Sequence, residues 1–212
     1  MKHKEGPEQA VAAARWSGWA LDEKQIRNLE EFAAWLREEA LPAGLIGPQE
    51  EKRLWGRHIA DSLVFAVGWK TVPGTVTDVG TGAGLPGVPL AVLWPECRVV
   101  LVERSQRRAD LVSRLIRILS LGNLEVRVAE ADQLEASAGM VMRAVLRPQQ
   151  AVELCGRLLL PAGRAVLGWP KGVTLGDARA WCGKRDLRLT RREVPASILD
   201  ESPSVLIIAA RG

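Results

Sequence analysis

A short stretch with four glycines, which follows a run of β-branched residues, is the first candidate for chemistry. It reads Asp78-Val-Gly-Thr-Gly-Ala-Gly-Leu-Pro-Gly87, and the residues Thr75–Val79 have the composition of a strand. Glycines let the backbone turn sharply and let a ligand approach without a Cβ in the way. Because glycine-rich turns also arise merely to join a strand to a helix, the spacing of Gly82 and Gly87 is a weak signal by itself.

Three acidic residues near the ends of three consecutive expected strands strengthen this signal. Asp78 stands just before the glycine turn, Glu103 ends the second strand and Asp132 follows the third. Glu103 can accept both hydrogen bonds of a ribose diol, and Asp132 can accept from an adenine amino group. Asp78 can meet an ammonium group, directly or through water, but would repel a pyrophosphate. Each acid alone is better explained as a solvated loop residue, whereas the ordered set favours S-adenosylmethionine over a dinucleotide.

The segment after the fourth expected strand bears on the type of methyl transfer. It reads Met142-Arg143-Ala144-Val145-Leu146. It lacks the Asn/Asp-Pro-Pro-aromatic turn often used on exocyclic amines and the cysteine nucleophile that C5 methylation of pyrimidines needs. An unprotonated ring nitrogen loses no proton when it attacks a sulfonium methyl group, so positioning, desolvation and a suitable field are sufficient. We therefore expect no catalytic base.

The pattern of apolar residues predicts the elements that position these groups. Residues 8–40 and 50–67 read as helices, and residues 1–72 are expected to form an N-terminal helical cap. From residue 73 to 212, β-branched runs alternate with helical stretches, which predicts an α/β, Rossmann-like domain with a seven-stranded, mostly parallel sheet. The expected strands are Thr75–Val79, Arg98–Glu103, Leu124–Val128, Met140–Arg143, Arg164–Gly168, Leu187–Val194 and Val205–Ala210, the last two as an antiparallel hairpin at or near one edge. The expected helices are Leu85–Leu93, Arg104–Leu121, Pro148–Leu159 and Leu175–Gly183.

The composition excludes several classes of protein. The 212 residues are 47% hydrophobic, with 29 Lys+Arg against 25 Asp+Glu, which is typical of a globular protein. No apolar run reaches the roughly 18 residues of a membrane span, and no secretory signal is recognisable, so we expect no membrane partner. Three well-separated cysteines and two histidines predict neither a disulfide framework nor a metal site, and a cytoplasmic location fits best.

Five motifs in order carry a resemblance to a known family. They are Arg57-His-Ile-Ala-Asp-Ser62, the glycine stretch 78–87, Arg143-Ala144, Leu159-Leu-Pro-Ala-Gly163 and Lys171-Gly172. Over residues 55–172 the chain resembles the RsmG family, also called glucose-inhibited division protein B. This is the family of small-subunit (16S) ribosomal RNA guanine-N7 methyltransferases. The resemblance implies a class I methyltransferase that uses S-adenosylmethionine as cofactor, with 16S rRNA or the small ribosomal subunit as its partner.

The resemblance also suggests roles for individual residues. Gly80 and Leu85 would contact the cofactor, Glu103 its ribose, Ala131 and Asp132 its adenine, and Arg143 would lie beside its methionine end. With the glycine turn included, the expected cofactor-binding residues are Asp78, Gly80, Gly82, Gly84, Leu85, Glu103, Ala131, Asp132 and Arg143. The catalytic residues stay unknown, with Arg143, Lys171 and His58 as candidates for positioning. Lys171 could contact rRNA phosphate or the target guanine, whereas a histidine that orients the cap explains His58 slightly better than a catalytic one.

Two alternatives stay open at this stage. The family's N-terminal helix usually leads into an Asn-Leu-Thr segment, whereas here Trp35 is followed by Leu36-Arg37-Glu38-Glu39-Ala40-Leu41-Pro42. This departure motivates a catalytically altered or inactive rRNA-binding or ribosome-assembly protein on the same fold. The other alternative, a nicotinamide-dependent oxidoreductase, is disfavoured by Asp78 and Asp132.

Two further features have open interpretations. The arginines of the expected helix 104–121 fit a solvated helix face better than an RNA-backbone patch. Trp169 is equally well explained by stacking on a base and by burial against the helical cap.

Overall fold

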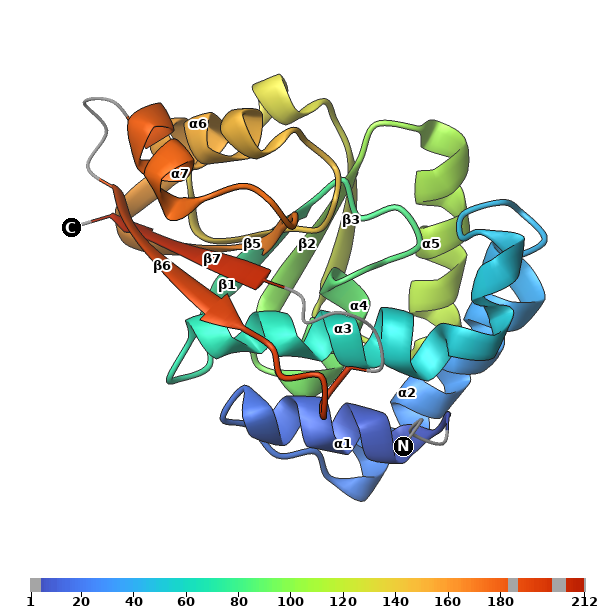
Figure 1. The fold of residues 1–212 in the computed structure, drawn as a ribbon. Helices are drawn as coiled ribbons and strands as arrows, with labels where there is room; N and C mark the ends of the chain where they lie inside the picture. Colours follow the sequence, from blue (N-terminus) through green and yellow to red (C-terminus); the bar gives the residue numbers. More distant parts are fainter. Residues whose placement is uncertain (1–4, 183–186, 200–204, 212) are drawn as a thin grey trace.

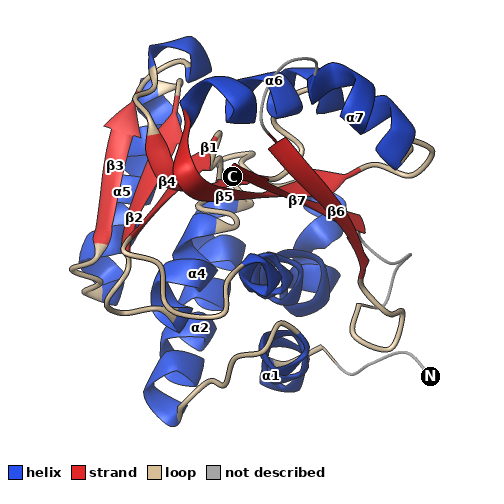
Figure 2. Ribbon diagram, turned by 90° about the vertical axis from the view of Figure 1, so that its left-hand side faces the viewer, coloured by secondary structure: helices blue, strands red, loops and turns tan. Residues whose placement is uncertain are grey.

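The computed structural model describes residues 5–182, 187–199 and 205–211, in which a twisted sheet has helices on both faces (Figures 1 and 2). Its seven strands are β1 (Thr75–Val79), β2 (Arg98–Glu103), β3 (Leu124–Val128), β4 (Ser137–Met142), β5 (Leu159–Trp169), β6 (Leu187–Glu193) and β7 (Val205–Arg211). Their order is β3-β2-β1-β4-β5-β7-β6, and β7 runs in the direction opposite to the other six strands. The predicted α/β class, strand number and antiparallel pair at one edge are confirmed.

The fourth and fifth strands begin earlier than predicted. β4 starts at Ser137 and β5 at Leu159, and these two residues pair with each other before a register shift leads to the pair Gly139 and Arg164. Pro161 and the left-handed Ala162 (φ 62°) interrupt the β pattern of the sequence there. The pairing partner on β4, rather than local propensity, therefore makes this segment a strand.

Four crossover helices lie close to their predicted positions. They are α4 (Gly87–Leu93), α5 (Gln106–Leu119), α6 (Pro148–Leu158) and α7 (Leu175–Cys182). Buried residues of α4 and α5 pack in one hydrophobic cluster with the cap, and those of α6 and α7 pack in a second. The two clusters use alternate residues of the strands, as Leu101 and Val102 of β2 show, because successive side chains of a strand point to opposite faces. Figure 2 shows α6 and α7 on one face of the sheet and α1, α2 and α4 on the other.

The prediction of one helix over residues 8–40 is wrong. The chain instead forms α1 (Pro7–Trp16), α2 (Glu23–Trp35) and a π-helical turn (Leu36–Ala40). Gly18, with φ 93°, ends the first helix. Asp22 then caps α2, since its carboxylate accepts from the backbone N–H of Gln25 while the Gln25 side chain accepts from the backbone N–H of Asp22, both at 2.8 Å.

The second helical segment of the cap is continuous but irregular. It consists of a 3-10 helix (Pro48–Arg53), a π-helix (Leu54–Ala60), α3 (Asp61–Leu63) and a second 3-10 helix (Val64–Gly68). The π-helix carries Arg57 and His58, and Asp61 follows at once. Wider π turns rotate the side chains that follow relative to a regular helix, and they occur often at functional sites.

Three tryptophans join the cap to the helix that follows the glycine turn. Trp94, which comes directly after α4, is fully buried. The rings of Trp19 and Trp69 meet it edge to face, with centroids 5.3 and 5.5 Å away. Because the cap and one face of the sheet share this hydrophobic core, the division of the chain between residues 72 and 73 stays a prediction.

Candidate active site

The glycine turn after β1 has the backbone that the sequence predicted. Gly80, Gly82 and Gly84 have φ values of 72°, 58° and 83°, in the region that only glycine adopts readily. The backbone N–H groups of Gly80 and Thr81 both donate to the carbonyl of Val102, at 2.9 Å. A Cβ at position 80 would lie 2.0 Å from a methyl group of Val145, so this side chain packs directly on the turn.

Asp78 holds the two ends of this turn together. It is fully buried, and its Oδ2 accepts from the Thr81 hydroxyl at 2.6 Å and from the backbone N–H of Gly87 at 2.8 Å. Its other oxygen, Oδ1, has no hydrogen-bond partner among the described residues. Burial raises the pKa of Asp78 to about 6, against the opposing effects of Thr81, Gly87 and Arg143. An ammonium group of a ligand is the kind of partner that would compensate this carboxylate.

Glu103, at the end of β2, faces the same turn. It is 4% exposed. Its two carboxylate oxygens accept from the backbone N–H groups of Gly82, at 3.2 Å, and Ser105, at 3.0 Å. Each carboxylate oxygen keeps a second lone pair, so Glu103 can bind the turn and two hydroxyl groups together.

The third predicted acid lies in a short 3-10 helix (Ala131–Gln133) after β3. The Asp132 side chain is exposed. The carbonyl oxygens of Ala131 and Asp132 accept from the guanidinium of Arg157 on α6, at 2.9 and 3.0 Å. Arg157 was missed by sequence reasoning because it lies on a crossover helix with no motif around it. Its planar guanidinium group binds both carbonyls and so holds this backbone in place after the carboxyl end of β3.

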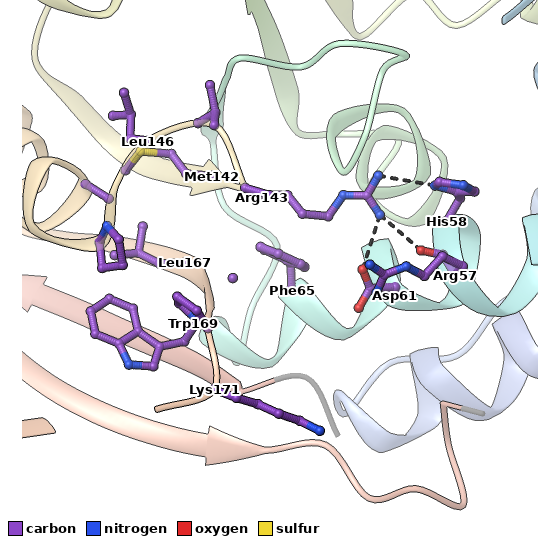
Figure 3. A pocket seen from close by; sticks show the side chains of 16 residues that line it. Arg57, His58, Asp61, Phe65, Met142, Arg143, Leu146, Leu167, Trp169 and Lys171 are labelled. Carbon is purple, nitrogen blue, oxygen red and sulfur yellow. Dashed lines mark hydrogen bonds and ion pairs between the residues drawn. The ribbon is translucent and has the colours of Figure 1, made fainter. Parts of the chain in front are cut away.

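A cavity of about 630 Å³ opens beside the glycine turn (Figure 3). Its walls are the loop after β4, the end of β5 and the helical segment of the cap that carries residues 57–65. Val145 lines the cavity and also packs on Gly80, so the cavity adjoins the turn. It brings together all three positioning candidates, which are His58, Arg143 and Lys171.

Arg143 reaches from the end of β4 to the cap. Its Nη1 donates to Asp61 Oδ2 and to the backbone carbonyl of Arg57, both at 3.2 Å, and its Nη2 lies 3.4 Å from His58 Nδ1 (Figure 3). The Arg143 side chain is only 19% exposed. The next residue, Ala144, has φ 54°, a conformation that is unfavourable for alanine, so the chain turns sharply just after the arginine. The sequence did not single out Asp61, which lies in the motif at residues 57–62, as a candidate site residue. It also did not single out Glu50, which faces His58 from the 3-10 helix at residues 48–53.

The surroundings of His58 determine its protonation. Since a guanidinium can only donate, Nδ1 must accept from Arg143, which leaves the ring proton on Nε2. Nε2 faces Glu50 Oε2 across 3.4 Å. Burial lowers the pKa of His58 to about 3, with further lowering by Arg143, Arg57 and Arg53. The imidazole is therefore neutral near pH 7 and is a very weak base.

The end of β5 supplies two other predicted residues. Lys171 is exposed and lies at a separate edge of the cavity from Arg143 (Figure 3). Trp169 is only 6% exposed, its indole N–H donates to the carbonyl of Val173 at 2.9 Å, and its ring lies 6.2 Å from that of Trp181. Trp169 is thus a core residue whose edge reaches the cavity, packed on the side of α7 rather than against the cap.

Two negative observations concern the described part of the chain. It contains no group of three or more His, Cys, Asp and Glu side chains that could hold a metal ion. It also contains no helix with the length and apolar character needed to cross a membrane.

Comparison with known proteins identifies the family. A family model described as "rRNA small subunit methyltransferase G" (GidB) matches residues 25–172. The chain belongs to this family. A relative named ribosomal RNA small subunit methyltransferase G, from Roseiflexus sp. (strain RS-1), is 32% identical, over 93% of this chain and 88% of the relative. A relative of the same name from Clavibacter michiganensis subsp. michiganensis is 36% identical, over 76% of this chain and 74% of the relative.

Solved structures support the fold of this GidB family member. A mutant of MtNAS in complex with S-adenosylmethionine aligns with a TM-score of 0.58 at 16% identity, covering 88% of this chain and 73% of that chain. The precorrin-6y C5,15-methyltransferase from Geobacter metallireducens GS-15 aligns with a TM-score of 0.50 at 17% identity, and the alignment covers 65% of this chain and 80% of that chain. The predicted class I methyltransferase fold is confirmed, and the nicotinamide-dependent alternative falls with the family assignment.

Proposed function

We propose that this chain transfers a methyl group from S-adenosylmethionine to N7 of a guanine in the 16S rRNA of the small ribosomal subunit. The family membership supports an rRNA substrate. The resemblance of the motifs to the guanine-N7 family carries the choice of atom, and the cavity beside the glycine turn is consistent with it, since among the described residues His58 is the imidazole that lines this cavity. With its pKa lowered to about 3, His58 is not suited to removing a proton near pH 7.

The residues around the turn fit this cofactor. Glu103 would hold the ribose diol, and Asp132 and the Ala131 backbone would meet the adenine. Gly80, Gly82, Gly84 and Leu85 would let the ligand approach the backbone. The buried oxygen Oδ1 of Asp78 would be compensated by a positive partner such as the amino-acid ammonium. Arg143 has five N–H donors, of which three meet Asp61, Arg57 and His58, so its remaining donors could meet the carboxylate. When bound, S-adenosylmethionine supplies an electrophilic methyl group.

Methyl transfer to guanine N7 requires the protein to position the reactants rather than to transfer a proton. N7 carries a lone pair and no proton, so no base has to act. Phe65 and Leu167 give the cavity apolar walls that exclude water, while Lys171 at its edge would hold the guanine or an adjacent phosphate. Arg143, held by Asp61, would fix the methionine end of the cofactor next to this cavity. We place this activity in the cytoplasm, where 16S rRNA is assembled into the small subunit.

The test is methyl transfer from labelled S-adenosylmethionine to small-subunit particles and to naked 16S rRNA, both lacking N7 methylation. Strand cleavage selective for N7-methylguanine then locates the product. We expect label in the RNA and cleavage at a single guanine, and the better substrate shows when in assembly the enzyme acts. Binding of S-adenosylhomocysteine and rRNA without any transfer would overturn the proposal in favour of a non-catalytic rRNA-binding or assembly protein.

A further inference from the structure

Helix α5 and the residue before its cap carry five arginines whose charges no described residue neutralises. All five are exposed, and none forms an ion pair or side-chain hydrogen bond within the part of the chain that the structure describes. They are Arg104, Arg107, Arg108, Arg114 and Arg117. Arginines on the strands differ, since Arg98 and Arg127 both pair with Glu125, and Arg191 pairs with Glu193.

The acids nearest to these arginines in the helix have other partners. Asp110 stands four residues before Arg114, where an ion pair commonly forms, but its carboxylate accepts from the Gln106 amide at 2.7 Å instead. Glu103 stands four residues before Arg107, but it binds the backbone of Gly82 and Ser105. Like charges three or four residues apart, such as Arg114 and Arg117, destabilise a helix, and an anionic partner would offset that cost.

Three of these arginines line one open groove. Arg107, Arg114 and Arg117 share it with Ser113, Asp110 and, from the cap, Ala43. Figure 1 shows the turn that follows α2 lying beside α5, where it forms the other wall. At 1.5 Å per residue the three arginines span about 15 Å along the helix, enough to face several successive phosphates of one strand. Asp110 is the single carboxylate among the lining residues, so the groove has a net positive charge.

We propose that this groove, walled by α5 and the turn at Ala43, is a docking site for the phosphate backbone of the rRNA substrate. It shares no lining residue with the cavity at Arg143, so it is a second contact surface rather than an extension of the active site. The guanidinium fork pairs bidentately with phosphate and carries no base specificity, so the groove holds the RNA in place while the cavity selects the guanine. The proposal rests on the proposed function, because it takes an RNA as the partner. It also reverses the preference from the sequence for a solvated face, since three of the five arginines converge on one groove and none has an ion pair among the described residues.

The test measures how RNA affinity depends on salt, with a 16S rRNA fragment as the probe. Wild type is compared with the double variant Arg114→Gln/Arg117→Gln, which keeps helix propensity. The matched control, Arg15→Gln/Arg179→Gln, also removes two exposed positive charges that lie outside the groove, from the end of α1 and from α7. Each lost phosphate contact lowers the slope of log affinity against log salt by about 0.7 to 0.9. We therefore expect the groove variant to lose about 1.5 from this slope and the control to keep the wild-type slope.

S-adenosylhomocysteine binding provides an independent check of folding, and we expect it to be equal in all three proteins. Should the groove variant fold poorly, Arg107→Gln/Arg114→Gln replaces it, with the same expected slope. If RNA binds to wild type and both groove variants keep its slope, the groove is not a docking site, while the proposed function stands. If wild type binds no RNA at any salt concentration, both the proposed function and the assignment of the groove are wrong.

Discussion

Nη1 of Arg143 donates to Oδ2 of Asp61 at 3.2 Å, across 82 residues of sequence. This contact joins the end of β4 to the helical cap inside the cavity. Both side chains are largely buried, at 19% and 11% exposure, so removing one partner leaves the other charge uncompensated and costs more than breaking a surface ion pair. Because we propose that Arg143 holds the methionine end of the cofactor, we expect Asp61 to act as a positioning residue through Arg143.

Asp61→Asn tests this role. Losing a charge-assisted hydrogen bond costs about 1.5 to 3 kcal/mol, which predicts a 10- to 150-fold lower kcat/KM for methyl transfer. We expect S-adenosylhomocysteine affinity to fall as well, measured by calorimetry. Glu96→Gln, which neutralises an exposed acid outside both the cavity and the groove, is the control and should match wild type in both assays. Equal values for the two variants would remove Asp61 from the site.

The variant Arg143→Lys distinguishes the contribution of the positive charge at position 143 from that of the planar guanidinium group. Lysine keeps the positive charge but lacks the fork that meets Asp61, the Arg57 carbonyl and His58 together. We expect cofactor affinity to fall by about 10-fold or more, in line with the loss of one or two hydrogen bonds to a charged group. Wild-type affinity in this variant would show that only the charge matters.

His58 predicts a pH dependence of stability with a definite sign. Its folded pKa of about 3 lies below the ordinary value of 6.5, so the unfolded chain binds the proton more readily between these two values. His58 therefore favours the folded state above pH 6.5 and loses that contribution as the pH falls toward 3. His58→Gln should flatten the fall in unfolding free energy over this range, measured by urea denaturation at a series of pH values. The same variant should leave the shape of the activity profile between pH 6 and 8 unchanged, because His58 does not titrate there.

The raised pKa of Asp78 predicts a pH dependence of stability with the opposite sign. Its folded pKa of about 6 lies above the ordinary 3.8, so its contribution to stability is complete below pH 3.8 and is lost as the pH rises through 6. Asp78→Asn can still accept from Thr81 and Gly87 through its amide oxygen, and it removes a buried charge. We expect its unfolding free energy to equal or exceed that of wild type at pH 7.5, with at least 10-fold weaker cofactor binding from the lost charge. Thermal melts with and without S-adenosylhomocysteine measure both effects, and unchanged affinity would limit Asp78 to its role in the turn.

Gly87→Ala tests how tightly the glycine turn is packed. A Cβ there would lie 2.2 Å from a Leu101 methyl group and 2.7 Å from Asp78 Oδ2. We expect a loss of about 1 to 3 kcal/mol in unfolding free energy, together with weaker cofactor binding. Gly74→Ala is the matched control, since a Cβ at Gly74 meets no atom within 4 Å and Gly74 does not have a left-handed φ. Equal stability of the two variants would contradict the geometry described for the turn.

The N-terminal region shows where sequence reasoning reached its limit in the fold. Helical periodicity continues across residues 17–22, so it predicted one helix where there are two. The break depends on one glycine, Gly18, and on the capping box at Asp22, which are weak signals inside a long periodic pattern. Likewise, Pro161 and Gly163 read as a loop, and the segment belongs to β5 because Leu159 and Arg164, on either side of them, pair with Ser137 and Gly139 of β4.

The sequence by itself determined the α/β class, the glycine turn and the placement of Asp78, Glu103 and Asp132 at the ends of three consecutive strands. It could do so because side-chain periodicity and turn chemistry are local properties of the chain. Only the tertiary structure decided that Asp61 and His58 hold Arg143, that Arg157 holds the backbone of Asp132, and that His58 is neutral. Packing of the folded chain creates the hydrogen bonds between distant segments and the burial that lowers a pKa. No residue spacing in the sequence indicates either of them.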